Sequence, residues 1–196
     1  MSNYCQYALK EWSVTIHSLL AGRQIMLFRK GGIHEQREGF QVEHSEFFLF
    51  PTYLHQNYLA LHSSFRSQFD SHNGVKAPTV TLNTYAEVQE LIPIANLGSL
   101  QGLDGLHTLD WTTVKQRFAY RNRPGLNLVL LRVYRLPVPR SITNLKRYEG
   151  CASWVELDEA LPTAGAEPVL PTRVFEDQVQ EIRRLVGAPS LAEEGH

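Results

Sequence analysis

Cysteine and long apolar runs are scarce in this sequence of 196 residues, and each scarcity excludes a class of protein. The two cysteines, Cys5 and Cys151, are too few for a disulfide framework and too far apart for a paired metal-ligand motif. The longest stretch without a formal charge, residues 47–65, contains Pro51 and several polar side chains, so it is too polar to span a bilayer. We therefore expect a globular protein from a reducing compartment, with no membrane partner.

Catalytic and nucleotide-binding motifs are also missing. None of the five lysines has a glutamate two positions before it, so the Glu-x-Lys pattern of restriction-type nucleases is absent. The sequence has no Gly-x-Ser-x-Gly nucleophile turn and no Gly-x-Gly-x-x-Gly dinucleotide fingerprint. These absences favour a protein that is not an enzyme, and they give no reason to expect a cofactor or a bound metal.

The amino terminus and the length bound the location and the domain count. Lys10 and Glu11 precede any apolar run, so we expect neither a signal peptide nor a transit peptide, and a cytoplasmic location. With 43% apolar and 20% charged residues, the composition is that of a globular chain. We expect residues 1–187 to form one domain and 188–196 to form a disordered tail.

The net charge of −1 hides a strong division along the chain. Residues 1–110 carry a formal charge of −3, residues 111–148 carry +9 without one acidic side chain, and residues 149–196 carry −7. Such asymmetry predicts either a surface for an anionic partner or an electrostatic contact inside the fold.

Hydrophobic spacing, glycines and prolines predict an α+β fold. Asp110 is a suitable N-cap for a helix that begins at Trp111, and Pro137 and Pro139 should end the apolar strand that precedes them. The expected helices cover residues 8–21, 55–65, 111 onward and 174–186, and the expected strands cover 25–29, 46–52, 79–88, 126–136 and 150–157. This order does not alternate regularly, so a single domain with a mixed β-sheet and flanking helices is the expected class.

The first candidate site is an anion-binding turn at Arg29, Lys30, Gly31 and Gly32, after an expected strand. Paired glycines allow backbone N–H groups to converge on an anion, and the two basic side chains could neutralise it. A solvent-exposed turn with two basic flanks is the alternative.

The second candidate lies in a region rich in histidine and glutamate. Glu35, Glu46 and His55 are candidates for an acid, a base or a metal ligand, because these residue types serve in such roles. The histidines lack the spacing of a zinc-binding helix or strand, so polar surface loops are the competing explanation.

The third candidate is the basic segment, residues 111–148. Arg117, Arg121, Arg123 and Arg135 are candidate nucleic-acid contacts, because arginines interleaved with aromatic side chains suit a single strand or a phosphate backbone. Arginine outnumbers lysine seven to two in this segment, which favours bidentate contacts to phosphates or carboxylates. The competing explanation is pairing with the acidic segment that follows, and Arg132, inside the most apolar strand, favours it.

Several stretches together resemble the uncharacterised family called domain of unknown function 1802. The resemblance extends from the Ala8–Trp12 start to the strand around Trp154 and rests on LFRKGGI, EFFLFPTYLHQ, LLRVYRLPVP and YEGCASWVEL. It implies a role near DNA, because similar domains are sometimes joined to restriction-endonuclease-like catalytic domains, and it implies no catalytic residues.

Three hypotheses follow. In the first, the protein is a non-enzymatic module that binds nucleic acid or another polyanion, linked to restriction-type DNA systems. In the second, it is a protein-interaction or homo-oligomeric scaffold in which the arginines pair with carboxylates. In the third, it is a hydrolase that acts on a phosphorylated or nucleic-acid substrate.

Overall fold

The computed structural model describes residues 2–30, 43–53, 56–69, 77–150 and 152–188. A seven-stranded sheet has its main strands in the order β2-β5-β4-β3-β1-β6, and β7 pairs with β5. The strands are β1 (Tyr4–Trp12), β2 (Met26–Arg29), β3 (Glu46–Thr52), β4 (Thr79–Ile94), β5 (Leu126–Thr143), β6 (Trp154–Pro162) and β7 (Glu167–Pro168). Because β1 and β3 run parallel while the other pairs are antiparallel, the sheet is mixed, as predicted.

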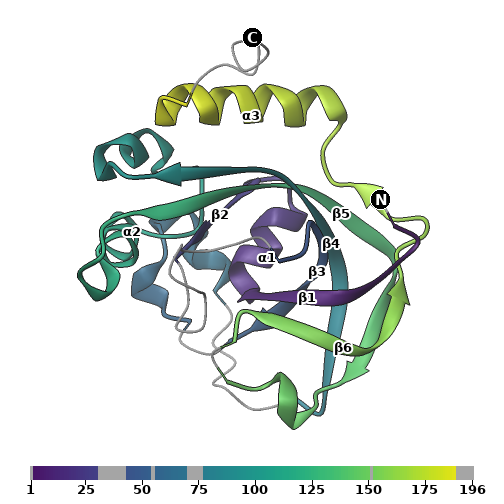
Figure 1. Ribbon diagram of the computed structural model, residues 1–196. Coiled ribbons are helices and arrows are strands. Elements are labelled where there is room, and N and C mark those ends of the chain that lie inside the picture. The colour runs from purple at the N-terminus through teal and green to yellow at the C-terminus, as the bar shows by residue number, and fades with distance from the viewer. Residues whose placement is uncertain (1, 31–42, 54–55, 70–76, 151, 189–196) are drawn as a thin grey trace.

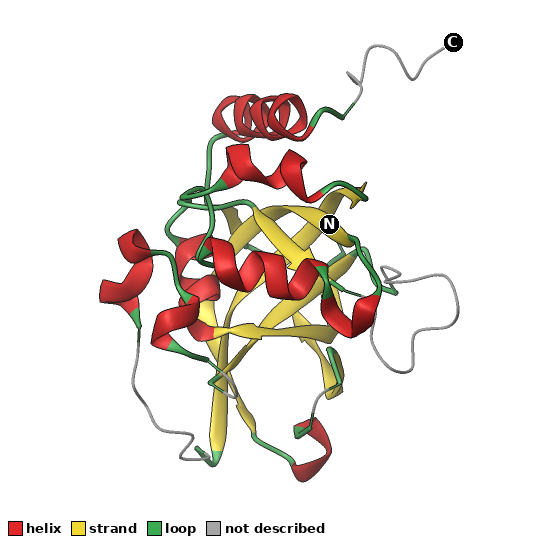
Figure 2. Ribbon diagram, turned by 90° about the vertical axis from the view of Figure 1, so that its left-hand side faces the viewer, coloured by secondary structure: helices red, strands yellow, loops and turns green. Residues whose placement is uncertain are grey.

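The sheet curls around the first helix. The three α-helices are α1 (Ser13–Leu20), α2 (Trp111–Phe118) and α3 (Thr172–Val186). Figure 1 shows α1 on the concave side of the strands, where every residue of the helix except His17 is buried. α3 packs outside the strands against the short 3-10 helix η3 (Leu97–Leu103), as Figure 2 shows from the side. Further 3-10 turns are η1 (Tyr58–Ala60), η2 (Ser63–Gln68), η4 (Tyr120–Asn122) and η5 (Lys146–Tyr148).

The long strand β5 continues past the two prolines at which the sequence analysis ended it. Between the register pairs Thr84–Arg135 and Leu82–Arg140 the pairing with β4 shifts, so β5 bulges outward there. Pro137 and Pro139 lie within this bulge, where a strand tolerates residues that lack an N–H donor. The bulge allows β5 to resume its pairing as far as Thr143.

Two predicted helices need correction. The predicted 8–21 helix is confirmed over residues 13–20, which form α1, but its first residues belong to a strand. Residues 4–12 form β1, because pairing with β3 on one side and β6 on the other outweighs their helical spacing. The region of the expected 55–65 helix holds the 3-10 turns η1 and η2 instead. Asn57 and His62 each accept a backbone hydrogen bond at the start of one of these turns, and such local bonds compete with an α-helix.

Candidate functional site: a basic cleft at the end of the sheet

The curvature of the sheet brings β2 next to β1, although β5, β4 and β3 separate them in the strand order. The contact is an ion pair, in which Arg29 Nη2 lies 3.0 Å from Glu11 Oε2. The same nitrogen donates to the Lys10 carbonyl oxygen at 2.8 Å, and the Trp12 amide donates to Glu11 Oε1 at 2.8 Å. Glu11 is only 7% exposed, so the pair neutralises a carboxylate that would otherwise be costly to bury.

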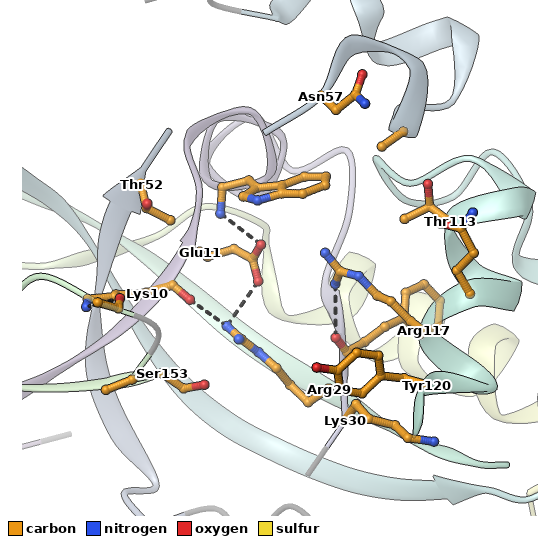
Figure 3. A pocket seen from close by; sticks show the side chains of 16 residues that line it. Lys10, Glu11, Arg29, Lys30, Thr52, Asn57, Thr113, Arg117, Tyr120 and Ser153 are labelled. Atoms are coloured by element: carbon orange, nitrogen blue, oxygen red, sulfur yellow. Dashed lines mark hydrogen bonds and ion pairs between the residues drawn. The ribbon is translucent and has the colours of Figure 1, made fainter. Parts of the chain in front are cut away.

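A cleft of about 620 Å³ opens above this ion pair, and Figure 3 shows its lining. Among the described residues, four basic side chains line it, namely Lys10, Arg29, Lys30 and Arg117, and Glu11 supplies the one carboxylate. They come from β1, from the end of β2 and from α2. We call this the basic cleft. Its volume is in the range of pockets that hold small molecules or single nucleotides.

Arg117 reaches the basic cleft from the last turn of α2. The predicted N-cap is confirmed, since Asp110 Oδ1 accepts a hydrogen bond from the Thr113 amide at 2.7 Å and fixes where α2 begins. Arg117 Nη1 donates to the Phe28 carbonyl oxygen at 3.3 Å, and the guanidinium carbon lies 5.1 Å from the centre of the Trp12 ring. The other terminal nitrogen points into the open space of the cleft (Figure 3).

Among the described residues, no carboxylate forms an ion pair with Arg117. Burial lowers its pKa, the carboxylate of Glu11 opposes that effect, and the neighbouring Arg29 adds to it. An arginine nevertheless stays charged at neutral pH. In the part of the chain that the structure describes, Arg117 forms no ion pair, and Glu11 already pairs with Arg29. An anion in the cleft would therefore lower the mutual repulsion of Arg29 and Arg117.

Lys30 belongs to the cleft wall, but its ammonium group is directed away from the Glu11–Arg29 pair (Figure 3). Its Nζ donates to the carbonyl oxygens of Phe118 at 2.7 Å and Gly125 at 2.5 Å, and also to that of Arg123. Burial lowers the pKa of Lys30. These bonds close the turn that follows α2 and so hold that helix against β2.

Tyr120 stands at the rim of the cleft, with 52% of its surface exposed. Arg121, one of the predicted nucleic-acid contacts, has a left-handed backbone with φ of 57° and places its guanidinium 5.3 Å from the centre of the Tyr120 ring. Arg123 is exposed in the same turn. The rim therefore combines an aromatic face with two cations, although Arg121 and Arg123 do not line the cleft itself.

Arg135 and Glu46 lie elsewhere. Arg135 donates to the Leu20 carbonyl oxygen at 2.9 Å, at the end of α1. Glu46 begins β3, whereas the cleft residue Thr52 ends it, so most of a seven-residue strand, about 20 Å, separates them. Glu46 accepts hydrogen bonds from the Tyr85 hydroxyl and from the Ser2 amide at 2.9 Å. Gly31, Gly32, Glu35 and His55, the remaining candidates, lie outside the described residues, as does the expected tail from residue 189 onward.

The basic segment packs against the acidic segment that follows it, since β7 pairs with β5, but this contact is not mainly ionic. Across the described residues, Arg147 with Asp158 is the one ion pair between them. Arg132, expected to need a partner, lies with its guanidinium carbon 4.7 Å from the centre of the Phe175 ring and donates to Thr172 Oγ1 at 3.3 Å. It therefore serves to attach α3 to β5.

Two residues of the cleft, Lys10 and Trp12, escaped the sequence analysis. The predicted 8–21 helix includes both, and the predicted cationic sites are limited to Arg29 and Lys30 and to residues 111–148. A strand that ends in Lys-Glu-Trp indicates polar groups at the end of a sheet. This signal can be used only when residues 4–12 are known to form a strand.

Fold and cleft together define a single-domain α+β protein with a basic cleft at one end of a curved mixed sheet. The family model described as "Domain of unknown function (DUF1802)" matches residues 8–181, and the chain belongs to this family. The resemblance inferred from the sequence is thereby confirmed. In the described residues, no helix is long and apolar enough to cross a bilayer, and no three histidine, cysteine or acidic side chains gather as metal ligands would.

Comparison with solved structures gives distant similarities. The crystal structure of ASCH from Zymomonas mobilis shares 10% sequence identity with a TM-score of 0.45, over 89% of this chain and 93% of that one. A mutant of the same protein shares 11% identity with a TM-score of 0.43, over 92% and 99% of the two chains. No curated protein matches the sequence. The proposal below therefore rests on the residues of this chain.

Proposed function

We propose that this protein is a binding module for nucleic acid or a related polyanion, and that the basic cleft is its anion site. The observation that carries the proposal is the position of Arg117, which lies in the cleft beside Arg29 with no carboxylate partner among the described residues. Counted over the residues that the structure describes, four basic side chains against one paired carboxylate give the cleft an excess of positive charge. Phosphate oxygens match the geometry of arginine N–H donors and accept bidentate hydrogen bonds from them.

The aromatic groups favour a nucleic acid among polyanions. Trp12 lines the cleft beneath Arg117, and Tyr120 stands exposed at the rim. A flat unpaired base gains more from stacking on such rings than a puckered sulfated sugar does, and polyphosphate has no group that stacks. The two predicted basic sites are far apart in sequence, one at the end of β2 and one in residues 111–148. They contribute Arg29 and Arg117 to the same cleft.

The test is a binding titration by fluorescence anisotropy. End-labelled single-stranded DNA and RNA of about 12 nucleotides, heparin and polyphosphate are compared at about 50 mM and about 200 mM salt. We expect micromolar or tighter binding to the oligonucleotides that weakens steeply at the higher salt. Arg117→Gln should weaken it about tenfold or more, because it removes a charge-assisted hydrogen bond.

Arg135→Gln is the matched control, since it removes the same charge from the same basic segment outside the cleft. Its affinity should stay within about twofold of the wild type. The proposal fails if no polyanion binds with salt dependence, or if Arg117→Gln and Arg135→Gln behave alike.

A further inference from the structure

A second concavity, of about 560 Å³, adjoins the basic cleft. The two share the lining residues Lys10, Thr52 and Gly150, so they meet at the ends of β1 and β3. Trp12 faces the basic cleft and the next residue, Ser13, faces the second concavity. Because the two concavities share three lining residues, an extended ligand can occupy both at once.

The second concavity has a different chemistry. Its polar lining is mostly neutral and includes Ser13, His17, Tyr53, Asn83 and Asn144, and we call it the neutral groove. His17 is the one exposed residue of α1, and Tyr53 is 39% exposed, so both rings are accessible to a planar ligand. Lys10 and Glu149, of opposite charge, stand where it meets the basic cleft, so the lining offers mainly hydrogen bonds and stacking without an excess of either charge.

The two asparagines present complementary groups. Asn83 Oδ1 accepts a hydrogen bond from Thr84 Oγ1 at 2.8 Å, and its amide nitrogen has no acceptor among the described residues. Asn144 Nδ2 donates to the Ala77 carbonyl oxygen at 3.0 Å, and within the same residues its side-chain oxygen has no donor. One amide thus keeps a donor and the other keeps an acceptor. A nucleobase carries both kinds of group on its Watson–Crick edge.

We infer that the basic cleft and the neutral groove together bind one single strand, with phosphates in the cleft and an unpaired base in the groove. This inference rests on the function proposed above and specifies its ligand. A duplex does not fit this arrangement, because its Watson–Crick edges are already paired and each concavity has the volume of a nucleotide-sized ligand. Recessed cations such as Arg117 are likewise reached more easily by a flexible strand than by a rigid helix.

The experiment measures binding of the full chain to a single strand, the duplex of the same sequence and the mononucleotide, in DNA and in RNA. The single strand should bind at least about tenfold more tightly than the duplex, and the mononucleotide should bind more weakly than the strand. Asn83→Ala and Asn144→Ala should each weaken binding of the single strand about fivefold while leaving the dependence on salt unchanged. Arg117→Gln should reduce the salt slope by about one, because it removes a phosphate contact.

Two further variants keep the test decisive. Asn83→Asp retains the bond from Thr84 but removes the free donor, so it should weaken binding even if Asn83→Ala fails to fold. Its loss should persist at about 200 mM salt, where the repulsion between the added charge and the phosphates is largely screened. Gln89→Ala, at an exposed position of the same strand, should bind like the wild type.

The outcomes separate the two proposals. If Arg117→Gln weakens binding while the asparagine variants do not, the neutral groove is not part of the site and the function stands. Duplex binding as tight as single-strand binding also overturns the inference. If neither form binds with salt dependence, the proposed function fails as well.

Discussion

Arg183, on α3, forms a buried ion pair with Glu90 of β4 and thereby fixes the carboxy-terminal helix to the sheet. The arginine is 2% exposed, so its charge is almost completely removed from water. The next residue, Arg184, is exposed and pairs with Glu181 on the same helix, with Nη2 2.6 Å from Glu181 Oε1. Comparing variants of these two adjacent arginines therefore measures how burial changes the contribution of an ion pair to the unfolding free energy.

Replacement of Arg183 should destabilise the fold strongly. Arg183→Met leaves Glu90 without its cation, and breaking a buried pair costs about 3–5 kcal/mol of unfolding free energy. Urea unfolding followed by circular dichroism measures the change. Arg184→Met is the control and should leave the midpoint nearly unchanged, because its ion pair is exposed to water. Equal shifts for the two variants would show that the buried pair does not hold α3.

The hydrogen bond from Tyr85 to Glu46 should make stability depend on pH in the acid range. The Tyr85 hydroxyl lowers the pKa of Glu46 to about 2, against the effect of burial and with help from the Ser2 amide. A depressed carboxyl pKa contributes stability above the unfolded pKa, about 4.5, and this stability is lost as pH falls toward 2.

Tyr85→Phe should therefore raise the pKa of Glu46 and lower the unfolding free energy at pH 7 by about 1.5–3 kcal/mol. Carbon-detected NMR titration of the Glu46 carboxyl measures the first effect, and urea unfolding measures the second. An unchanged Glu46 pKa in Tyr85→Phe would contradict the assignment of its cause.

Buried His107 should give a second, separate pH dependence. Burial lowers its pKa to about 3, and His62 and Arg117 contribute to the shift. Its Nδ1 accepts from the Leu109 amide at 3.2 Å, so the folded state holds the ring neutral. In the unfolded state the ring binds a proton near pH 6.5. The unfolding free energy is therefore unaffected by protonation of His107 above pH 6.5 and decreases as pH falls from 6.5 toward 3.

The expected slope is about 1.4 kcal/mol of unfolding free energy for each pH unit below 6.5. His107→Asn retains an acceptor for Leu109 but cannot titrate, so its stability should change less between pH 4.5 and 6.5 than that of the wild type. Unfolding midpoints across this range make the comparison. Parallel curves for the two proteins would remove His107 as the origin of the slope.

The N-cap of α2 should influence binding as well as stability. Asp110→Ala removes the acceptor of the Thr113 amide and should cost about 1 kcal/mol of stability. Because α2 carries Arg117 into the basic cleft, oligonucleotide affinity should fall together with stability. Asp110→Asn keeps a capping oxygen and should preserve both. A loss of affinity in the asparagine variant equal to that in the alanine variant would argue against a positioning role.

The sequence predicted correctly those elements whose bounds depend on neighbouring residues, such as a capping side chain or a short apolar run. β3 has the predicted bounds of 46–52, and α2 begins at Trp111 because the Asp110 cap is a feature of adjacent residues. β1 was mistaken for a helix because its identity depends on partners at 46–52 and 154–162, which no short window contains. The length of β5 depends on the bulge, which arises from its pairing with β4.

The candidate site was predictable only in parts. Arg29, Lys30 and Arg117 were identified by charge and position, but their meeting depends on the curvature that brings β2 to β1. Lys30 illustrates the limit, because its bonds to Phe118 and Gly125 carbonyl oxygens join residues far apart in sequence. Arg135 carries the same charge in the same segment, yet it lies at the end of α1.

The place of β1 between β3 and β6 has a consequence for the order of events during synthesis. β1 is made long before residues 154–162, so its second edge stays unpaired until they emerge from the ribosome, and the cleft residue Ser153, which accepts a hydrogen bond from the Lys10 amide at 2.8 Å, arrives with them. Such long-range pairing slows folding, because the chain must close a large loop first. A growing chain therefore completes the wall of its anion site only after the cleft cations Lys10, Arg29, Lys30 and Arg117 have already been made.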